Sequence, residues 1–387
     1  MKRKTCLVFS ACALTVIPAF GDGFYVPVQA PEATGKGNAW LATADSAAAV
    51  YYNAAGLTQI DSPEVTVGAY AIMLGLKADL DSGENQKADN DWAFLPQIYA
   101  AVPINDKLVA GFGLNTPFGL ATDWADDSQF SAIAVETELT YATLWSVLGY
   151  ELTDTFSIGG GFGVHHADLR MRRAVAPGVL SEFEGDSEAL SWTISAHWKP
   201  TDQHAFGLVY RSKSDFKLDG DAKIVGGAGA PATLDFMTPS TLGAGYSYTP
   251  CKEWNFEANI EYVNWDELNT LYLRQGGGST PAPFNWNSNF IYSVGATRFF
   301  ENGWNVSAGY NYIENSIPDS NYNPGVADAD RHWLNAGVGR QYDAFKWSFA
   351  YQYAFSNNDV SGSPGGLADG KFKSSFHGIM MNCGWQF

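Results

Sequence analysis

The sequence of 387 residues predicts an all-β fold, a 14-stranded antiparallel transmembrane β-barrel that is plugged by an N-terminal hatch. Three observations predict it. Apolar and polar residues alternate with a period of two, short and long connectors alternate along the chain, and the last strand ends on Phe387. After the N-terminus, no run approaches the roughly 18 consecutive apolar residues of a membrane-spanning helix. A closed barrel is the other structure that pairs every backbone polar group within lipid.

The beginning of the chain has the layout of a secretory signal peptide. A basic start at residues 2–4 is followed by an apolar run, and the small residues Ala19 and Gly21 precede the expected cleavage before Asp22. The predicted domains are residues 1–21 as signal peptide, 22–62 as N-terminal segment (the hatch) and 63–387 as barrel.

The composition limits the possible partners. The sequence holds 23 basic and 41 acidic residues, and removal of the three basic residues of the signal peptide leaves 20 against 41, a net charge of −21. Such an acidic chain is a poor partner for nucleic acid. Only Cys251 and Cys383 remain after cleavage, too few for a disulfide framework.

Alternation is clearest in the segment that begins at Trp254. One face carries Trp254, Phe256, Ala258, Ile260 and Tyr262, and the other carries Asn255, Glu257, Asn259 and Glu261. The same pattern recurs at 304–312, 347–355 and 379–387. A soluble β-sandwich also alternates, but its aromatic residues would crowd an interior and its polar face would carry more lysine and arginine. The barrel is therefore favoured over the sandwich.

The connectors between strands are short and long in turn. Short turns are predicted at 103–106, 152–155, 200–203, 250–253, 301–303 and 343–344, and long polar connections at 78–91, 116–135, 173–187, 220–233, 267–284, 318–330 and 357–371. Short periplasmic turns that alternate with long extracellular loops are typical of outer-membrane barrels. These connectors join 14 strands, and an even number places Phe387 on the periplasmic side.

About 40 residues precede the first clear strand, which is predicted at 63–71. They are rich in alanine and glycine, do not alternate, and carry aromatic residues such as Trp40 and Tyr51. A disordered tail is less hydrophobic than this. Because a barrel of this width leaks unless its lumen is filled, the segment is predicted to plug it.

Several motifs resemble those of a known family. Gly23-Phe24-Tyr25, the stretch 37–42 and the stretch 43–57 together resemble the N-terminal hatch of the FadL/TodX family of outer-membrane hydrophobic-compound transporters. Family members usually carry Asn-Pro-Ala where this chain has Asn53-Ala54-Ala55. Further matches lie at 111–120, which contains Pro117-Phe118-Gly119, and at 152–162.

The resemblance implies a monomeric barrel in the outer membrane of a Gram-negative cell, with a periplasmic C-terminus and the hatch inside the lumen. It implies capture of a hydrophobic compound by the extracellular loops, passage past the hatch, and lateral release through the wall at a kinked third strand. The implied hatch gate is Asn53, Ala54, Ala55 and Gly56, and the implied kink residues are Gly111, Gly113 and Asn115. Long-chain fatty acids are the expected substrate, and neutral aromatic or aliphatic hydrocarbons are the alternative.

Candidate substrate residues follow from chemistry as well as from the resemblance. The long connector 116–135 is more apolar than a solvated loop, which suits either capture of a substrate or packing over the barrel. A carboxylate head group would also need a cation, and Arg172 and Arg173 are candidates that could equally contact lipopolysaccharide. The predicted capture and binding residues are Phe24, Tyr25, Pro117, Phe118, Leu120, Trp124, Phe130, Arg172 and Arg173. If the lumen offers no suitable cation, a neutral hydrocarbon is the better expectation.

Other functions receive little support. His165 and His166 point to opposite faces of a strand and cannot easily share a metal ion. We predict no metal, no cofactor and no catalytic residue, because no nucleophile motif stands out. A general diffusion porin remains an alternative, although porins constrict with an extracellular loop. The expected partners are the substrate, outer-membrane lipid and lipopolysaccharide, and the barrel assembly machinery, through the strand that ends in Phe387.

Overall fold

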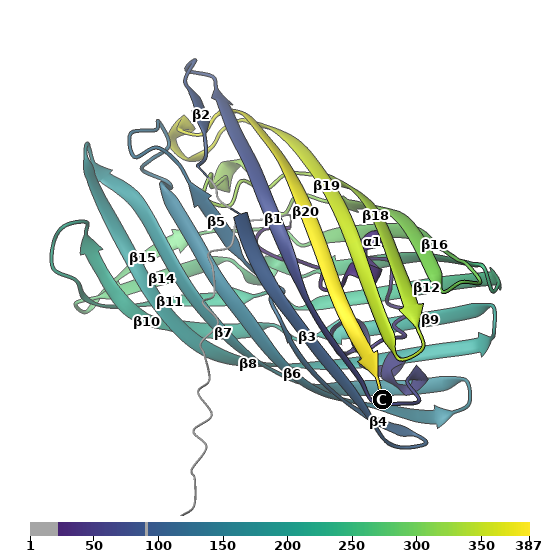
Figure 1. The fold of residues 1–387 in the computed structure, drawn as a ribbon. Coiled ribbons are helices and arrows are strands. Elements are labelled where there is room, and N and C mark those ends of the chain that lie inside the picture. Colours follow the sequence, from purple (N-terminus) through teal and green to yellow (C-terminus); the bar gives the residue numbers. More distant parts are fainter. Residues whose placement is uncertain (1–21, 90–91) are drawn as a thin grey trace, which may run out of the picture.

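The computed structural model describes residues 22–89 and 92–387 and shows a closed antiparallel β-barrel (Figure 1). The predicted signal peptide lies outside the described residues. Within them, 14 strands form the wall, as the sequence predicts. The wall strands, in chain order, are β1 (Glu64–Leu80), β3 (Trp92–Asn105), β4 (Leu108–Asn115), β6 (Glu136–Thr153), β7 (Phe156–Ala176), β8 (Val179–Thr201), β9 (His204–Arg211), β12 (Thr241–Cys251), β13 (Trp254–Val263), β16 (Asn289–Phe299), β17 (Trp304–Ile313), β18 (Arg331–Tyr342), β19 (Phe345–Val360) and β20 (Gly370–Gln386).

The barrel closes where the first strand meets the last. β1 pairs with β20 from Glu64↔Gln386 to Leu80↔Gly370, an uninterrupted antiparallel register. β1 is longer than the 63–71 predicted from alternation, because pairing with β20 continues to Leu80. The partner strand, rather than the local pattern, sets where this strand ends.

Apart from the N-terminal segment, the other elements gather at the end of the barrel with the long connectors, called here the loop end (upper left in Figure 1). They are β2 (Asn85–Lys87), β5 (Leu120–Asp123), β10 (Ser214–Ile224), β11 (Ala230–Thr238), β14 (Thr270–Gln275), β15 (Gly278–Pro283) and the 3₁₀ helices η2 (Trp265–Glu267), η3 (Asp319–Asn321) and η4 (Pro364–Gly366). The short turns lie at the opposite end, called the turn end.

Several predicted long connectors are in fact hairpins of paired strands, among them 173–187, 220–233 and 267–284. β7 and β8 remain paired as far as Ala176↔Val179, so most of 173–187 is strand and the turn is only Pro177-Gly178. β14 and β15 are joined by Gly276 and Gly277, both with positive φ (57° and 81°). Positive φ at both central residues is the backbone of a tight hairpin turn, which glycine adopts without strain.

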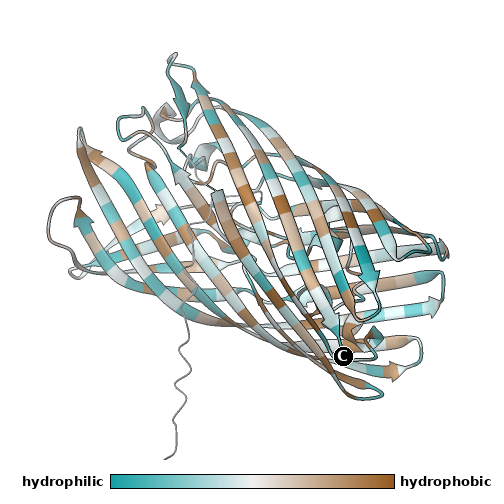
Figure 2. Ribbon diagram, in the orientation of Figure 1, coloured by the Kyte–Doolittle hydropathy of each residue, from teal (hydrophilic) through white to brown (hydrophobic). Residues whose placement is uncertain are grey.

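The wall presents apolar side chains outward and polar or small ones inward. On β8, Trp192 and Ile194 are exposed on the outer face, whereas Thr193 and Ser195 are buried inside. In Figure 2, hydrophobic and hydrophilic residues alternate along the wall strands. Among the described residues, no helix is both long and apolar enough to cross a membrane.

The N-terminal segment lies inside the barrel, where nearly all of its side chains are buried. It contains the short helices α1 (Pro31–Gly35) and α2 (Ala49–Tyr52) and the 3₁₀ helix η1 (Ala54–Gln59). Pro31 starts α1, where a missing N–H costs nothing. The Asn53 side chain accepts a hydrogen bond from Ala55 N and so caps η1.

Candidate functional site

The start of the N-terminal segment pairs with a break in the wall between β4 and β5. Val26 N donates to Pro117 O at 2.8 Å, and Gly119 N donates to Phe24 O at 2.9 Å. The chain between β4 and β5 therefore turns its main-chain hydrogen bonds inward, to the segment, instead of sideways to a neighbouring strand.

A gap in the strand pairing lies beside this break. β3 pairs with β4 from Ile98↔Leu114 to Asn105↔Leu108. For the loop-end half of β3, residues 92–97, the strand pairings of the described residues are with β1 alone. Gln97 is buried at this edge, and neither its side-chain nitrogen nor its oxygen has a hydrogen-bond partner. The wall is thus interrupted next to the predicted kink strand.

Gln29 joins the N-terminal segment to the same break. Its Nε2 donates to Thr116 O at 3.0 Å and its Oε1 accepts from Thr116 N at 3.2 Å. Its backbone N donates to Tyr52 Oη, and its carbonyl accepts from Tyr99 Oη on β3. Gln29 therefore links the segment to both sides of the wall gap, to Thr116 through its side chain and to Tyr99 through its backbone carbonyl.

An aromatic cluster fills the lumen above this junction. The Phe24 ring lies 4.8 Å from that of Trp265 and 5.8 Å from that of Trp286, with Phe118 and Phe236 also in contact. Tyr25 packs against Phe118 at 5.2 Å. The predicted residues Phe24, Tyr25 and Phe118 are therefore in one cluster inside the barrel.

The apolar residues of the 116–135 connector turn inward as well. Leu120, Trp124 and Phe130 are buried, with Trp124 and Phe130 rings 5.1 Å apart. Both rings contact Phe372 of β20, and Trp124 Nε1 donates to Pro324 O at 2.9 Å. These residues pack over the lumen, so any capture by them requires the loops to part.

Trp124, Phe130 and Phe372 form an apolar cap over the lumen. A buried arginine lies at the edge of this apolar cap. Arg331 is 3% exposed; its Nη2 donates to Ala327 O and lies 3.4 Å from Asp328 Oδ1. Its Nε and Nη1 have no hydrogen-bond partner. Tyr322 lies near Arg331, and its ring lies 4.7 Å from that of Phe372. It therefore connects the arginine to the apolar residues of the 116–135 connector. Burial raises the pKa of Tyr322 well above its ordinary value, and the Arg331 guanidinium opposes that rise.

Arg211, another inward-facing arginine, is already occupied. Its Nη2 donates to Tyr51 O at 2.6 Å, its guanidinium lies 4.4 Å from the centre of the Tyr51 ring, and its Nη1 is 3.5 Å from Glu261 Oε1. It lines two small cavities of about 10 and 20 Å³, beside Tyr25. Each cavity holds about one water molecule, so neither of these two cavities has room for a hydrocarbon chain.

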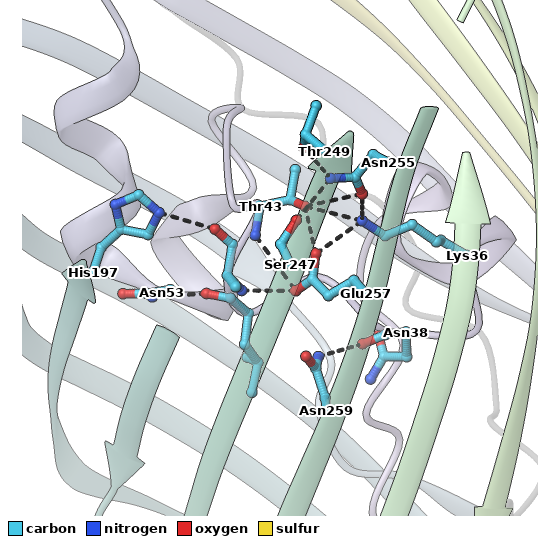
Figure 3. A network of polar contacts seen from close by, with 12 residues as sticks. Lys36, Asn38, Thr43, Asn53, His197, Ser247, Thr249, Asn255, Glu257 and Asn259 are labelled. Carbon is cyan, nitrogen blue, oxygen red and sulfur yellow. Dashed lines mark hydrogen bonds and ion pairs between the residues drawn. The ribbon is translucent and has the colours of Figure 1, made fainter. Parts of the chain in front are cut away.

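The middle of the N-terminal segment is fixed to the opposite wall by a buried polar network (Figure 3). Lys36 Nζ lies 2.9 Å from Glu257 Oε2, and the two side chains are 2% and 0% exposed. Lys36 Nζ also donates to Asn255 Oδ1 at 2.7 Å, while Glu257 Oε1 accepts from Ala42 N at 2.7 Å. Thr43 Oγ1 donates to Glu257 Oε2. Several bonds therefore hold this part of the segment to the intact wall strand β13.

The predicted gate residues are held in a similar way. Asn53 Nδ2 donates to Leu41 O at 2.8 Å and to Ala196 O of β8 at 3.2 Å. Ala55 N donates to Ser195 Oγ at 3.0 Å. Ala54 stands where the family usually has proline, and the Asn53 cap of η1 holds the turn here.

Wall glycines make room for the segment. A Cβ on Gly159 would lie 2.3 Å from Ala55 N, so only glycine lets the gate approach β7 so closely. At the predicted kink residues, a Cβ on Gly111 would lie 2.7 Å from Val50, and one on Gly113 would lie 2.8 Å from Tyr99. These glycines are contact positions for the segment, and a side chain at any of them would push it inward.

Arg172 and Arg173 lie away from the lumen. Arg172 belongs to the outer face of β7, where it forms ion pairs with Glu136 at 2.8 Å and Glu182 at 2.5 Å. Arg173 is exposed. The structure therefore separates these two cations from the aromatic cluster of Phe24, Tyr25 and Phe118 and from the buried residues Leu120, Trp124 and Phe130.

Sequence reasoning missed Lys36, Asp328 and Arg331. One signal was available, because Glu257 and Glu261 lie on the inner face of an alternating strand, where buried carboxylates need cations. Lys36 is a basic residue in an alanine- and glycine-rich segment and is the natural partner. No local pattern marks Asp328 and Arg331.

Comparisons with known proteins agree with this architecture. The family model "Outer membrane protein transport protein (OMPP1/FadL/TodX)" matches residues 12–377. The chain is 24% identical to the long-chain fatty acid transport protein of Escherichia coli O6:H1, over 87% of this chain and 88% of that protein.

Solved structures share the fold. A Pseudomonas aeruginosa FadL homologue superposes with a TM-score of 0.86 at 19% identity, covering 95% of this chain and all of that one. The Ralstonia pickettii toluene transporter TbuX gives 0.74 at 15% identity, covering 92% and 98%. Since the family model matches nearly the whole chain, the chain belongs to the OMPP1/FadL/TodX family of outer-membrane transport proteins, which are not enzymes.

Proposed function

We propose that this barrel takes up long-chain fatty acids by loop capture, passage past the N-terminal segment, and lateral release through the gap beside β3. The observation that carries the proposal is the wall break that hydrogen bonds to Phe24 and Val26 of the segment. A movement of the segment's start removes the two bonds that cover the gap.

The apolar cap supports capture of a hydrophobic tail. A hydrocarbon gains roughly 25 cal/mol for each Å² removed from water, and Trp124, Phe130 and Phe372 offer such surface once the loops part. The gap supports lateral release, because Trp92 and Phe94 on the adjacent half of β3 are exposed on the outer, lipid-facing side. A tail that leaves there does not re-enter water.

Arg331 supports a carboxylate head group. A buried guanidinium with two unpartnered nitrogens is costly to leave unsatisfied, and a carboxylate is its natural acceptor. The tail would then lie along Tyr322 and Phe372 toward the capture residues. Arg331 takes the role that Arg172 and Arg173 were expected to play. Arg172 on the outer face and the exposed Arg173, both at the loop end, suit lipopolysaccharide instead.

Two alternative functions could use the same barrel architecture. Uptake of neutral aromatic or aliphatic hydrocarbons by the same route is favoured by the fold shared with toluene transporters. A general diffusion porin is disfavoured by the aromatic cluster around Phe24 and by the small size of the internal cavities.

The orientation follows from the connectors. We propose that the loop end faces outward and the turn end faces the periplasm, with the C-terminal strand presented to the barrel assembly machinery. We also propose that the barrel acts as a monomer, since the lumen, its cap and the wall gap are all built from one chain.

Substrate uptake by Arg331 variants tests the proposal. Cells without their own fatty acid and hydrocarbon channels would express wild type, Arg331→Gln, Arg331→Lys, or the control Arg340→Gln at the turn end, where the guanidinium stacks on Trp304. We expect Arg331→Gln to lower labelled oleate uptake about tenfold, the loss of one charge-assisted hydrogen bond, with toluene uptake unchanged and Arg331→Lys intermediate.

Three outcomes would count against it. Equal oleate uptake with and without the wild-type protein would defeat transport itself. Equal losses of oleate and toluene in Arg331→Gln would defeat the head-group role. Toluene uptake without oleate uptake by the wild type would favour the neutral alternative.

A further inference from the structure

Asp22 is a buried carboxylate with half of its hydrogen-bonding capacity unused. It is fully buried inside the barrel, near the loop end. Its Oδ1 accepts from Trp265 Nε1 at 2.5 Å and from Asn289 Nδ2 at 2.6 Å. Its Oδ2 has no hydrogen-bond partner. A buried carboxylate with one unbonded oxygen is stabilised by a positively charged hydrogen-bond donor.

A second buried carboxylate holds the next residue. Asp328 Oδ2 accepts from Gly23 N at 3.1 Å and from Ser316 Oγ at 2.8 Å. Its Oδ1 has no hydrogen-bond partner and only the long 3.4 Å contact with Arg331. Burial raises the pKa of Asp22 well above its ordinary value, and the charge of Asp328 raises it further.

The charges around this point do not balance. Asp22 and Asp328 are two carboxylates beside one cation, Arg331, while the nearby Glu261 is already paired with Arg211. A buried carboxylate without a counter-charge is strongly unfavourable. One further positive group is needed, and it must lie within reach of Asp22 Oδ2 and Asp328 Oδ1.

We propose that Asp22 and Asp328 form a binding site for a primary ammonium group, the α-ammonium that signal-peptide cleavage creates on Asp22 itself. Hydrolysis of the Gly21–Asp22 peptide bond by a signal peptidase adds the hydroxyl of water to the Gly21 carbonyl carbon and leaves the amine on Asp22, which is protonated at neutral pH. The uncleaved chain has at that position a neutral amide with a single N–H.

The position of the new group is fixed by contacts already described. The α-nitrogen of Asp22 is three covalent bonds from Gly23 N, and Gly23 N is bound to Asp328. Tyr25 N donates to Asp22 O at 2.9 Å and folds the start of the segment into a turn. An ammonium with three donors therefore sits between the two carboxylates that lack one.

Signal-peptide cleavage thereby completes the set of polar contacts of Asp22 and Gly23 with Asp328. We call this set of contacts the latch at the start of the N-terminal segment. This consequence rests on the proposed function, because only a gated channel needs a latch. The ammonium site itself does not, and its test involves no transport.

The accessibility of the α-amine tests the site. Mass spectrometry of the purified protein should first show an N-terminal peptide that begins at Asp22. Reductive methylation of the folded barrel should then modify this amine at least roughly tenfold more slowly than after heat denaturation in detergent. Exposed lysines such as Lys371, which is 62% exposed in its side chain, provide the internal rate standard.

Matched variants separate the site from general burial. Asp328→Asn and Asp22→Asn should each raise the methylation rate of the folded protein's α-amine. Asp330→Asn, an exposed carboxylate in the same loop that binds Asn315 N and Tyr312 Oη, should leave it unchanged. Heat-modifiable migration in gel electrophoresis confirms that each barrel is folded.

The inference is overturned by a mature chain that begins elsewhere, or by a wild-type α-amine that reacts as fast as in Asp328→Asn. If the site is present but the Asp328→Asn barrel leaks no more ions than wild type, the latch fails and the ammonium site stands. If oleate uptake is absent while the amine is protected, only the proposed function fails.

Discussion

Lys36 carries a charge into the most enclosed part of the lumen. Its ion pair with Glu257 is fully buried, and Asn255 and Thr43 satisfy the remaining hydrogen bonds. A buried pair of this kind adds little to stability relative to a well-packed apolar pair, but loss of one partner leaves the other charge stranded. The pair therefore fixes where the N-terminal segment sits more than how stable the barrel is.

Lys36→Met should destabilise the seating of the segment by about 3–5 kcal/mol, because Glu257 keeps its charge and loses its counter-ion. The double variant Lys36→Met/Glu257→Gln should recover much of that loss. Urea titration of segment release, followed by protease cleavage within residues 22–62, measures both. Lys373→Met, which removes an exposed pair with Asp79, is the control; a similar effect there would contradict the role given to burial.

Single residues also show where sequence reasoning stops. The apolar character of Trp124 and Phe130 is evident from the sequence, but their burial depends on Phe372, which lies more than 240 positions further along the chain. Arg331 looks like any strand residue, and its unpartnered N–H groups are evident only once the strands are assembled. The chemical character of a residue was predictable from the sequence, whereas the residues that it contacts in the fold were not.

At the level of elements, residues 24–29 of the segment bond to the wall break, whereas its middle bonds to intact wall strands. The start is joined to the wall break by two main-chain bonds and by Gln29. The middle is bonded through Glu257 and through Asn53 and Ser195. Motion that opens the gap beside β3 therefore belongs to the start.

Hydrogen exchange followed by mass spectrometry should rank these elements. Amides of residues 24–29 and 116–119 should exchange roughly tenfold faster than those of residues 36–43, an opening free energy lower by about 1.4 kcal/mol. The paired strands β6 and β7 provide the slow reference. Uniform protection across the whole segment would mean that it moves as one body or not at all.

Strand existence was predictable because each wall strand faces two different solvents and must alternate. Strand length was less predictable. β7 and β8 extend well beyond the apolar band because they continue to pair with each other, and charged residues such as Glu182 and Glu184 are as acceptable there as in a loop. The break between β4 and β5 has a visible sign, Pro117, which cannot donate a ladder hydrogen bond.

At the scale of the whole molecule, the N-terminal segment occupies the lumen of a wide barrel. Removal of the segment should leave the wall intact, since wall strands pair with one another from β1 round to β20. Deletion of residues 22–58 should therefore turn a barrel with small or no currents into one with large, steady ion currents in planar bilayers. Unchanged conductance would show that the segment is not the plug, provided that the variant still migrates as a folded barrel.

The seam between β1 and β20 has a consequence for biogenesis. It joins Glu64 to Gln386, so the barrel cannot close until the last residues of the chain are available. The N-terminal segment is made first, yet Lys36 has no counter-ion until β13 is in place. During export this segment therefore stays exposed, with an unpaired charge on Lys36, until the wall strands have formed around it. A chaperone that shields it, or a closure step that wraps around it, is therefore a requirement of the topology, and assembly is expected to be slow.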